Sequence, residues 1–314
     1  MSSTARLSTT SEGLWLTAAL CGVLELPPVL KVRPVGSVEA TLADHPGIVV
    51  LERAGLCRAG VVGPDVREWV ETLGRPDVEV DVVVSRPDRA PTRLLGPPPL
   101  FEAPPDWIEA ARALAEWHGR RPPQRVVALC RRDGTWVSAA RLWRAGDDDI
   151  DDVVVSPLGG ADVGVAVREV LGQAQPAQFG GINSETARLG PVLSAWQTNP
   201  SISVVDELVR VGLSGPQARV VEAVCDAGAA RATISAAEFS IDGPVWAPLA
   251  LTVADTMLGR VVVSYTVGPD GRLWTTLLPG SGTAIDGAVT ELLEGLPCGR
   301  GWGTHQRVRN FAAP

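Results

Sequence analysis

Residues 125–140 read RVVALCRRDGTWVSAA, and residues 260–278 read RVVVSYTVGPDGRLWTTLL. Each stretch contains an apolar run, an Asp–Gly pair and a second run that begins near a tryptophan, Trp136 or Trp274. An Asp–Gly pair between two strand-like runs predicts a β-hairpin, because a tight primed turn needs positive φ at its central residues. We therefore predict two matching hairpins, with the two tryptophans packed at equivalent positions of a repeated unit.

Helices and strands are predicted on both sides of these hairpins. Capping residues and periodic apolar positions predict helices at 12–24, 65–73, 162–172, 184–196, 204–211, 215–227 and 284–295. Alternating or continuous apolar runs predict further strands at 28–34, 77–85, 153–156, 231–240 and 247–254. Each half of the chain thus has helices, strands, a hairpin and a final helix. This order predicts an α/β (α+β) fold with pseudo-twofold symmetry, in which residues 12–172 and 173–314 form halves that share one core.

The composition argues against several classes of protein. The net charge is −8, which disfavours broad nucleic-acid binding through a basic surface. The five cysteines are far apart in the sequence, which predicts reduced thiols and provides neither a zinc motif nor a disulfide framework. Lys31 is the only lysine, and we attribute the excess of arginine to a high-GC genome rather than to guanidinium chemistry.

The N-terminus is predicted to be a disordered polar tail, residues 1–11, followed by a packed helix. Residues 14–24 are apolar enough to resemble a signal peptide, but Glu12 lies where a signal peptide has its positive flank. Pro27 and Pro28 end the segment as they would end a packed helix. No apolar run approaches the ~20 residues of a membrane helix. We therefore predict a cytoplasmic protein without membrane insertion.

A long proline-rich segment at 86–124 interrupts the pattern of helices and strands. Proline cannot donate to a sheet ladder, so its nine prolines predict a loop outside the sheet interior. Asp106 and Glu109 have the spacing of a capping box and predict one short helix at 106–117. The apolar side chains of the segment argue against simple disorder, and Trp107 and Trp117 are predicted to cover a partner or the protein's own surface.

Little in the sequence indicates catalysis. His45, His118 and His305 are far apart and lie in no motif, and the chain has no phosphate loop, dinucleotide fingerprint or nucleophile elbow. The acidic run at 147–152 could attract calcium but lacks the ligand spacing and turn glycine of a calcium loop, so a solvated connection is favoured. We predict no catalytic residue, no cofactor and no metal site.

A series of short motifs is spread along the whole chain, at residues 12–16, 26–34, 45–47, 70–77, 136–139, 255–261, 278–280 and 296–297. Their order resembles that of the EspG family of type VII (ESX) secretion-associated proteins. The resemblance extends from about residue 12 to about residue 308.

This resemblance implies a cytosolic chaperone without enzymatic activity. Family members bind PE–PPE heterodimers at the hydrophobic tip of the PPE protein, and their fold is a central, largely antiparallel sheet flanked by two helical bundles. In the family, the PPE tip contacts a long loop, the sheet and the C-terminal bundle. The resemblance also implies that the protein can form a homodimer when no substrate is bound. Carried to this chain, the partner-binding residues are Arg93, Leu94, Leu95, Leu100, Phe101, Trp107, Ile108, Leu208, Val209, Leu213, Val220, Val221 and Val224.

Two other interpretations stay open at this point. The first is an enzyme of unrecognised type, with His45, His118 or the acidic run at 147–152 in its site. The second is a scaffold protein that oligomerises through the proline-rich segment.

Overall fold

The computed structural model describes residues 6–32, 42, 45, 47–85, 105–106, 109, 124–142, 152–226 and 228–308. Within these residues the helices are α1 (Ser11–Leu20), α2 (Gly47–Arg53), α3 (Pro64–Gly74), α5 (Val163–Leu171), α6 (Thr186–Thr198), α7 (Val204–Arg210), α8 (Gly215–Cys225) and α9 (Gly282–Glu294). Two short 3₁₀ helices are η1 (Pro28–Leu30) and η3 (Gly299–Gly303).

Eleven strands form one large sheet, and two short strands, β2 (Cys57–Arg58) and β3 (Val61–Val62), pair separately. The large sheet contains β1 (Leu7–Thr10), β4 (Val78–Ser85), β5 (Gln124–Arg132), β6 (Thr135–Leu142), β7 (Asp152–Gly159), β8 (Ile182–Glu185), β9 (Ala230–Ser240), β10 (Gly243–Trp246), β11 (Leu251–Thr256), β12 (Gly259–Val267) and β13 (Leu273–Pro279).

The strand order shows the pseudo-twofold symmetry of the sheet. It runs β1-β7-β6-β5-β4-β9-β11-β12-β13-β8, with β10 paired to β9. The two halves of the chain therefore meet at β4 and β9, which pair antiparallel from Val78 opposite Glu238 to Ser85 opposite Arg231. Reading outward from this junction, each half contributes five strands in matching order, and the second half adds β10 beside β9. The fold class expected from the sequence is confirmed.

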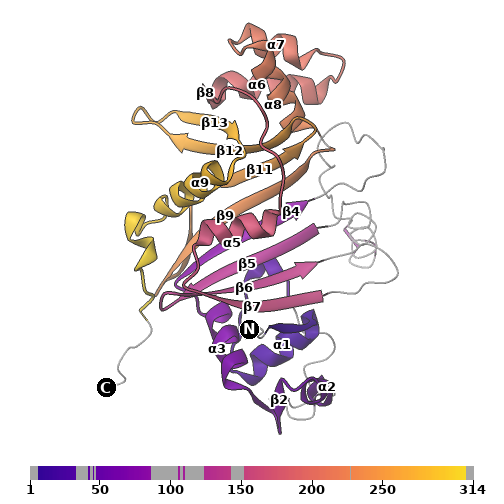
Figure 1. The fold of residues 1–314 in the computed structure, drawn as a ribbon, viewed down its shortest axis with the longest axis vertical. Helices are drawn as coiled ribbons and strands as arrows, with labels where there is room; N and C mark the ends of the chain where they lie inside the picture. Colours follow the sequence, from indigo (N-terminus) through magenta and orange to yellow (C-terminus); the bar gives the residue numbers. More distant parts are fainter. Residues whose placement is uncertain are drawn as a thin grey trace.

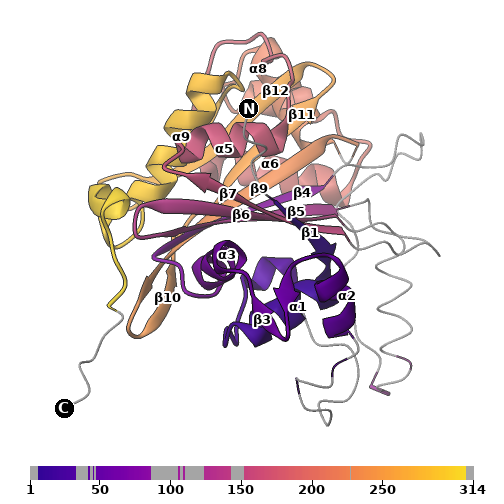
Figure 2. The same ribbon diagram turned by 60° about the horizontal axis from the view of Figure 1, so that its bottom comes forward.

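Strand pairing shows which helices share a face of the sheet. Val126, Val83, Thr233, Thr252 and Val263 are successive cross-strand partners from β5 to β12, so their side chains point to one face. On this face α1 and α3 pack on β5 and β6, and α6 to α8 pack on β12 and β13. Helices α5 and α9 pack together on the opposite face. Figure 1 shows α1–α3 and α6–α8 at opposite ends of the sheet, and Figure 2 shows α3 and α5 on opposite sides of it.

The two hairpins predicted from the sequence do not occupy equivalent positions in the pseudo-twofold sheet. The first hairpin is formed by β5 and β6. Counted outward from β4 at the junction, these are the second and third strands of the first half. The second is formed by β12 and β13, whose counterparts in the first half are β6 and β7. The prediction that Trp136 and Trp274 occupy equivalent positions is therefore wrong by one strand. Trp136 opens β6 and is buried, whereas Trp274 lies in β13 and is only partly buried.

The turns of the two hairpins also differ. Asp133 and Gly134 both have positive φ, at 51° and 83°, as the predicted tight primed turn requires. In the second hairpin only Gly271 has positive φ, at 76°, and residues 268–272 form a longer loop. The amide of Gly268 donates to the Arg272 carbonyl at 2.8 Å, and the amide of Gly271 donates to the Gly268 carbonyl at 2.9 Å. The Asp–Gly pair thus predicts a hairpin at both places but the tight turn at only one.

Two predictions near the N-terminus are wrong. Residues 7–10, placed by the sequence in the disordered tail, form β1 and pair with β7, and the side chain of Leu7 is buried. In the described part of the predicted strand at 28–34, residues 28–30 form η1 instead, and Lys31 ends this turn in the left-handed conformation with φ at 49°. The helix expected from residue 12 starts at Ser11, and Thr10 caps it by accepting from the Gly13 amide.

Most other local signals are confirmed. The helices predicted at 204–211, 215–227 and 284–295 are present as α7, α8 and α9. Ser203 caps α7, Ser214 and Gln217 form a capping box at the start of α8, and Ser281 caps α9. The strand at 182–185, β8, is an addition that the sequence does not indicate. Residues 184 and 185, which the sequence assigns to the start of a helix, belong to this strand. Helix α6 therefore starts at Thr186, two residues later than expected.

Three buried arginines attach irregular segments to the sheet. Arg141 donates to the carbonyls of Leu30 and Lys31, and Arg131 donates to those of Trp302, Gly303 and His305. Arg260 donates to those of Leu171 and Gly172 and to the carboxylate of Asp255. A guanidinium has five N–H donors in a fixed fork, whereas a lysine has one compact ammonium. These three positions therefore use guanidinium chemistry, whatever the origin of the overall arginine excess.

Candidate functional site

The seven site residues expected on the proline-rich segment lie outside the described residues. They are Arg93, Leu94, Leu95, Leu100, Phe101, Trp107 and Ile108. One contact of the predicted short helix is described. The amide of Glu109 donates to Asp106 Oδ1 at 2.9 Å, which is the contact expected of an aspartate cap.

The six site residues expected on the C-terminal bundle are mostly core residues. Four of them, Leu208, Leu213, Val220 and Val221, are buried in the cluster that α6 to α8 form with β12 and β13. Val224 packs partly against the same cluster. Val209, in α7, is 44% exposed. The helix periodicity explains this split, because adjacent positions 208 and 209 point to different sides of α7. Val209 is therefore the one of the six with a large surface available to a partner.

Between the two bundles the sheet presents a polar strip, which we call the inter-bundle face: Val83, Thr233, Ser235 and Thr252. Thr233 is exposed and the other three are partly buried. Its position follows from the symmetry, since the bundles lie toward the outer strands and leave β4, β9 and β11 between them. The side chain of Trp246, 42% exposed, belongs to the same face through its pairing with Ala237. A partner that reached this face would meet a rigid sheet with hydroxyl groups and one aromatic ring.

Two buried carboxyls lie on β4 on the same face of the sheet. Glu79 and Asp81 are two residues apart on one strand, so their side chains are neighbours on one face, and each affects the ionisation of the other. Glu79 Oε1 and Asp81 Oδ1 have no hydrogen-bond partner, although both residues are almost fully buried. Burial raises the pKa of Glu79 to about 9, with a further contribution from Asp81, and raises the pKa of Asp81 to about 7. The pair therefore holds at least one proton at neutral pH. No motif in the sequence marks these two residues, and only their alternation with valines along one strand indicates them.

The titratable groups in the described residues show no arrangement typical of nucleophilic catalysis. Burial raises the pKa of all five cysteines, so none of them is an activated thiolate. His45 accepts from the Gly47 amide at 3.1 Å and lies against the Trp15 ring, with 5.8 Å between ring centroids. His118 and residues 147–151 lie outside the described residues. No helix in the described part of the chain has the length and apolar character needed to cross a membrane.

A family model describes nearly the whole chain. The model of the EspG family matches residues 10–96 and 100–291. This protein therefore belongs to the EspG family.

Individual relatives agree with this assignment. The chain is 26% identical over 304 residues to the ESX-5 secretion-associated protein EspG5 of Mycobacterium marinum, with 95% of each chain covered. It is 27% identical over 327 residues to the ESX-2 secretion-associated protein EspG2 of Mycobacterium tuberculosis, covering 96% of this chain and 99% of that one. Among solved structures, the Mycobacterium tuberculosis type VII secretion system chaperone EspG5, in complex with a PE25–PPE41 dimer, has the same fold. The TM-score is 0.70 at 22% identity, covering 94% of this chain and 98% of that one.

Proposed function

We propose that this protein is a cytoplasmic chaperone and adaptor without catalytic activity. It binds the hydrophobic tip of the PPE protein in a PE–PPE heterodimer, keeps the pair soluble and directs it to its cognate ESX type VII secretion system. The observation that carries the proposal is membership of the EspG family across almost the whole chain. The structural similarity to a chaperone that binds a PE25–PPE41 dimer supports it.

The proposed binding surface has three parts. Thr233 and Thr252 on the inter-bundle face supply a rigid floor, and Val209 supplies an exposed apolar side chain on the C-terminal bundle. The seven residues predicted on the proline-rich segment supply the remaining contacts. The other five residues of the bundle support α7 and α8 from within the core and contribute to binding indirectly.

The energetic basis of such binding is the burial of apolar surface. Each Å² of apolar surface that a PPE tip loses to solvent on binding contributes about 25 cal/mol before the costs of ordering are subtracted. A segment with several large apolar side chains can adapt to tips of different sequence, while the sheet and bundle stay rigid. The net charge of −8 influences the association rate more than the affinity.

The test is co-expression with a PE–PPE pair encoded near the gene. We expect a 1:1:1 complex on size-exclusion chromatography. Val209→Arg should weaken binding at least 10-fold in a calorimetric titration, because it places a charge against the apolar tip. Val165→Arg is the matched control, since Val165 is 39% exposed on α5, on the opposite face of the sheet. Equal affinity for both variants and the wild type would exclude α7 from the interface, and the absence of any complex would refute the chaperone proposal.

Deleting residues 90–120 separates the chaperone from the scaffold interpretation. If the proline-rich segment covers the PPE tip, the deletion should abolish PE–PPE binding and leave the far-ultraviolet circular dichroism of the remaining chain unchanged. If the segment instead joins copies of the protein, analytical ultracentrifugation should show loss of self-association. A deletion variant that retains full PE–PPE affinity would show that the segment takes no part in recognition.

A further inference from the structure

The chain after α9 is held against the end of the sheet by buried polar groups. Arg131 on β5 donates to three carbonyls of the segment, those of Trp302, Gly303 and His305. Asp77, just before β4, accepts from the Arg307 amide at 2.9 Å. In Figure 1 this segment, drawn in yellow, runs from α9 past the ends of the central strands. Cys298 and His305 are thereby brought beside β9.

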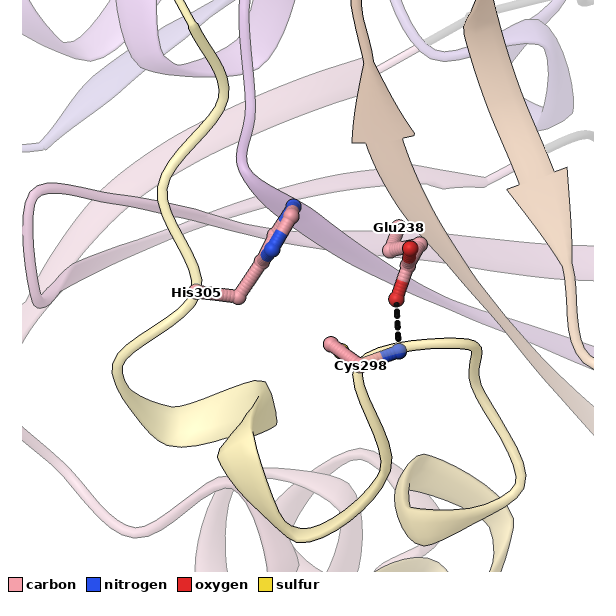
Figure 3. Close-up of side chains that lie close together, drawn as sticks. All are labelled: Glu238, Cys298 and His305. Atoms are coloured by element: carbon pink, nitrogen blue, oxygen red, sulfur yellow. Dashed lines mark hydrogen bonds between the residues drawn. The ribbon is translucent and has the colours of Figure 1, made fainter.

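Three possible metal ligands meet where the segment crosses β9. They are the carboxylate of Glu238, the thiol of Cys298 and the imidazole of His305, and Figure 3 shows them around one small space. One ligand atom from each residue lies within 4.8 Å of those from the other two. In a tetrahedral zinc site the ligand atoms are about 3.3–3.8 Å apart, given Zn–S of about 2.3 Å and Zn–N or Zn–O near 2.1 Å. Closing around an ion therefore requires a shift of about 1 Å.

One ring nitrogen of His305 is held by a backbone carbonyl. Its Nε2 lies 2.9 Å from the Phe239 carbonyl oxygen. A carbonyl oxygen only accepts, so Nε2 carries the proton and Nδ1 keeps a lone pair. Metal-ligating histidines commonly donate their second N–H to a carbonyl in this way, which fixes both tautomer and ring orientation.

The carboxylate of Glu238 is also held in place, and it keeps lone pairs that can bind a metal ion. Its Oε2 accepts from the backbone amide of Cys298 at 2.7 Å, which positions the carboxylate beside that thiol. An ionised carboxylate has about four lone-pair sites, and this bond uses one of them. Burial, together with the same carboxylate, raises the pKa of the Cys298 thiol, which places the two groups close together.

The charges near the cluster suit a divalent ion. A thiolate from Cys298 and a carboxylate from Glu238 would neutralise a doubly charged cation. Arg131 and Asp77, which hold the same segment, are buried and of opposite charge, so they add no net charge. The bound cluster would therefore leave no uncompensated charge among these groups.

We propose that Glu238, Cys298 and His305 form a site for a zinc-class divalent cation. Thiolate, imidazole and carboxylate are the three ligand types that zinc uses in proteins, and three of them leave the fourth tetrahedral position for water or another donor. The ion would attach the segment after α9 to β9. This site is independent of the proposed chaperone function.

The test uses the full chain, treated with a chelator and then titrated with Zn²⁺ or Co²⁺. We expect one equivalent of Zn²⁺ by metal analysis and a rise in melting temperature, because an ion that binds only the folded state stabilises it. Co²⁺ should produce a thiolate-to-metal charge-transfer band in the near ultraviolet. Cys298→Ser should abolish the band, and His305→Ala should lower the affinity at least 10-fold. Cys225→Ser, which replaces a partly buried cysteine on α8, is the control and should leave both readouts unchanged.

The wild-type measurement decides the question even if a variant fails to fold. Absence of both zinc uptake and the cobalt band in the folded wild-type chain would overturn the proposal. So would a cobalt band that persists in Cys298→Ser or disappears in Cys225→Ser, since the thiolate ligand would then not be Cys298.

Discussion

Replacing Arg260 with alanine is expected to lower the free energy of unfolding by about 1.5–3 kcal/mol, because it removes a buried charged donor from its acceptors, one of which, the carboxylate of Asp255, is 33% exposed. The guanidinium is buried, and its Nε and Nη2 lie 2.6 and 2.9 Å from the two oxygens of Asp255. It also donates to the carbonyls of Leu171 and Gly172, at 3.2 and 2.7 Å. The substitution leaves all of these acceptors without their donor.

The side chain of Arg260 links two other elements to β12. Its guanidinium joins the end of α5, at Leu171 and Gly172, to Asp255 on β11. The backbone of the same residue also binds Gln175, Ala177 and Gly280, but alanine keeps these main-chain bonds, so they do not add to the loss. The substitution should therefore loosen the contact of the end of α5 with β11 and β12.

The measurement is urea denaturation followed by circular dichroism. Arg272→Ala is the matched control, because Arg272 makes its ion pairs with Glu185 and Asp270 at the surface, where such pairs contribute about 0–1 kcal/mol. If both variants shifted the midpoint equally, the buried contacts of Arg260 would not be the source of its stabilising effect.

The second large effect expected is a fall in stability as the pH rises from about 5 to about 9. Burial raises the pKa of Glu79 to about 9 and that of Asp81 to about 7 in the folded protein, from ordinary values of 4.5 and 3.8. Between the two sets of values the folded state binds more protons than the unfolded state. Unfolding therefore becomes more favourable with increasing pH, and the stabilisation is lost as the pH passes through the folded pKa values.

Glu79→Gln tests this expectation because it removes one titrating group and keeps the shape of the side chain. We expect the variant to be more stable than the wild type at pH 9, by a few kcal/mol, since each pKa unit corresponds to about 1.36 kcal/mol. At pH 5 the two proteins should differ little, because the wild-type pair is then protonated. Glu291→Gln, an exposed position on α9, is the control and should not change the slope of stability against pH. A wild-type stability that is flat over this range would contradict the raised pKa values.

Local features of this protein could be read from the sequence because their causes lie within a few residues. The turn at Asp133 and Gly134 needs only two residues that tolerate positive φ, and the caps at Ser203 and Ser214 need only one side chain and an amide three residues away. Family membership was likewise accessible from the order of short motifs. The main local errors fell where tertiary pairing overrides composition, as at residues 7–10, whose polar sequence is held in β1 by β7.

The candidate site depended on the tertiary structure to a greater degree. The periodicity of residues 204–224 shows an apolar helix pair, but only packing on β12 and β13 buries Leu208 and leaves Val209 exposed. Glu79 and Asp81 alternate with valines as in any half-exposed strand. Their burial follows from the position of β4 at the centre of the sheet, which is set by its pairing with β9.

The repeated hairpin illustrates the difference between what the sequence determines and what the tertiary structure decides. The sequence by itself determined that both stretches form antiparallel hairpins, that the chain has two related halves, and to which family it belongs. Only the tertiary structure decided that the two hairpins occupy different places in the symmetry, one strand apart. The same holds for the meeting of Glu238, Cys298 and His305, whose side chains come from β9 and from the segment after α9. The physical reason is that turns and caps depend on neighbouring residues, whereas strand order and side-chain clusters depend on which distant segments can bury their apolar faces together.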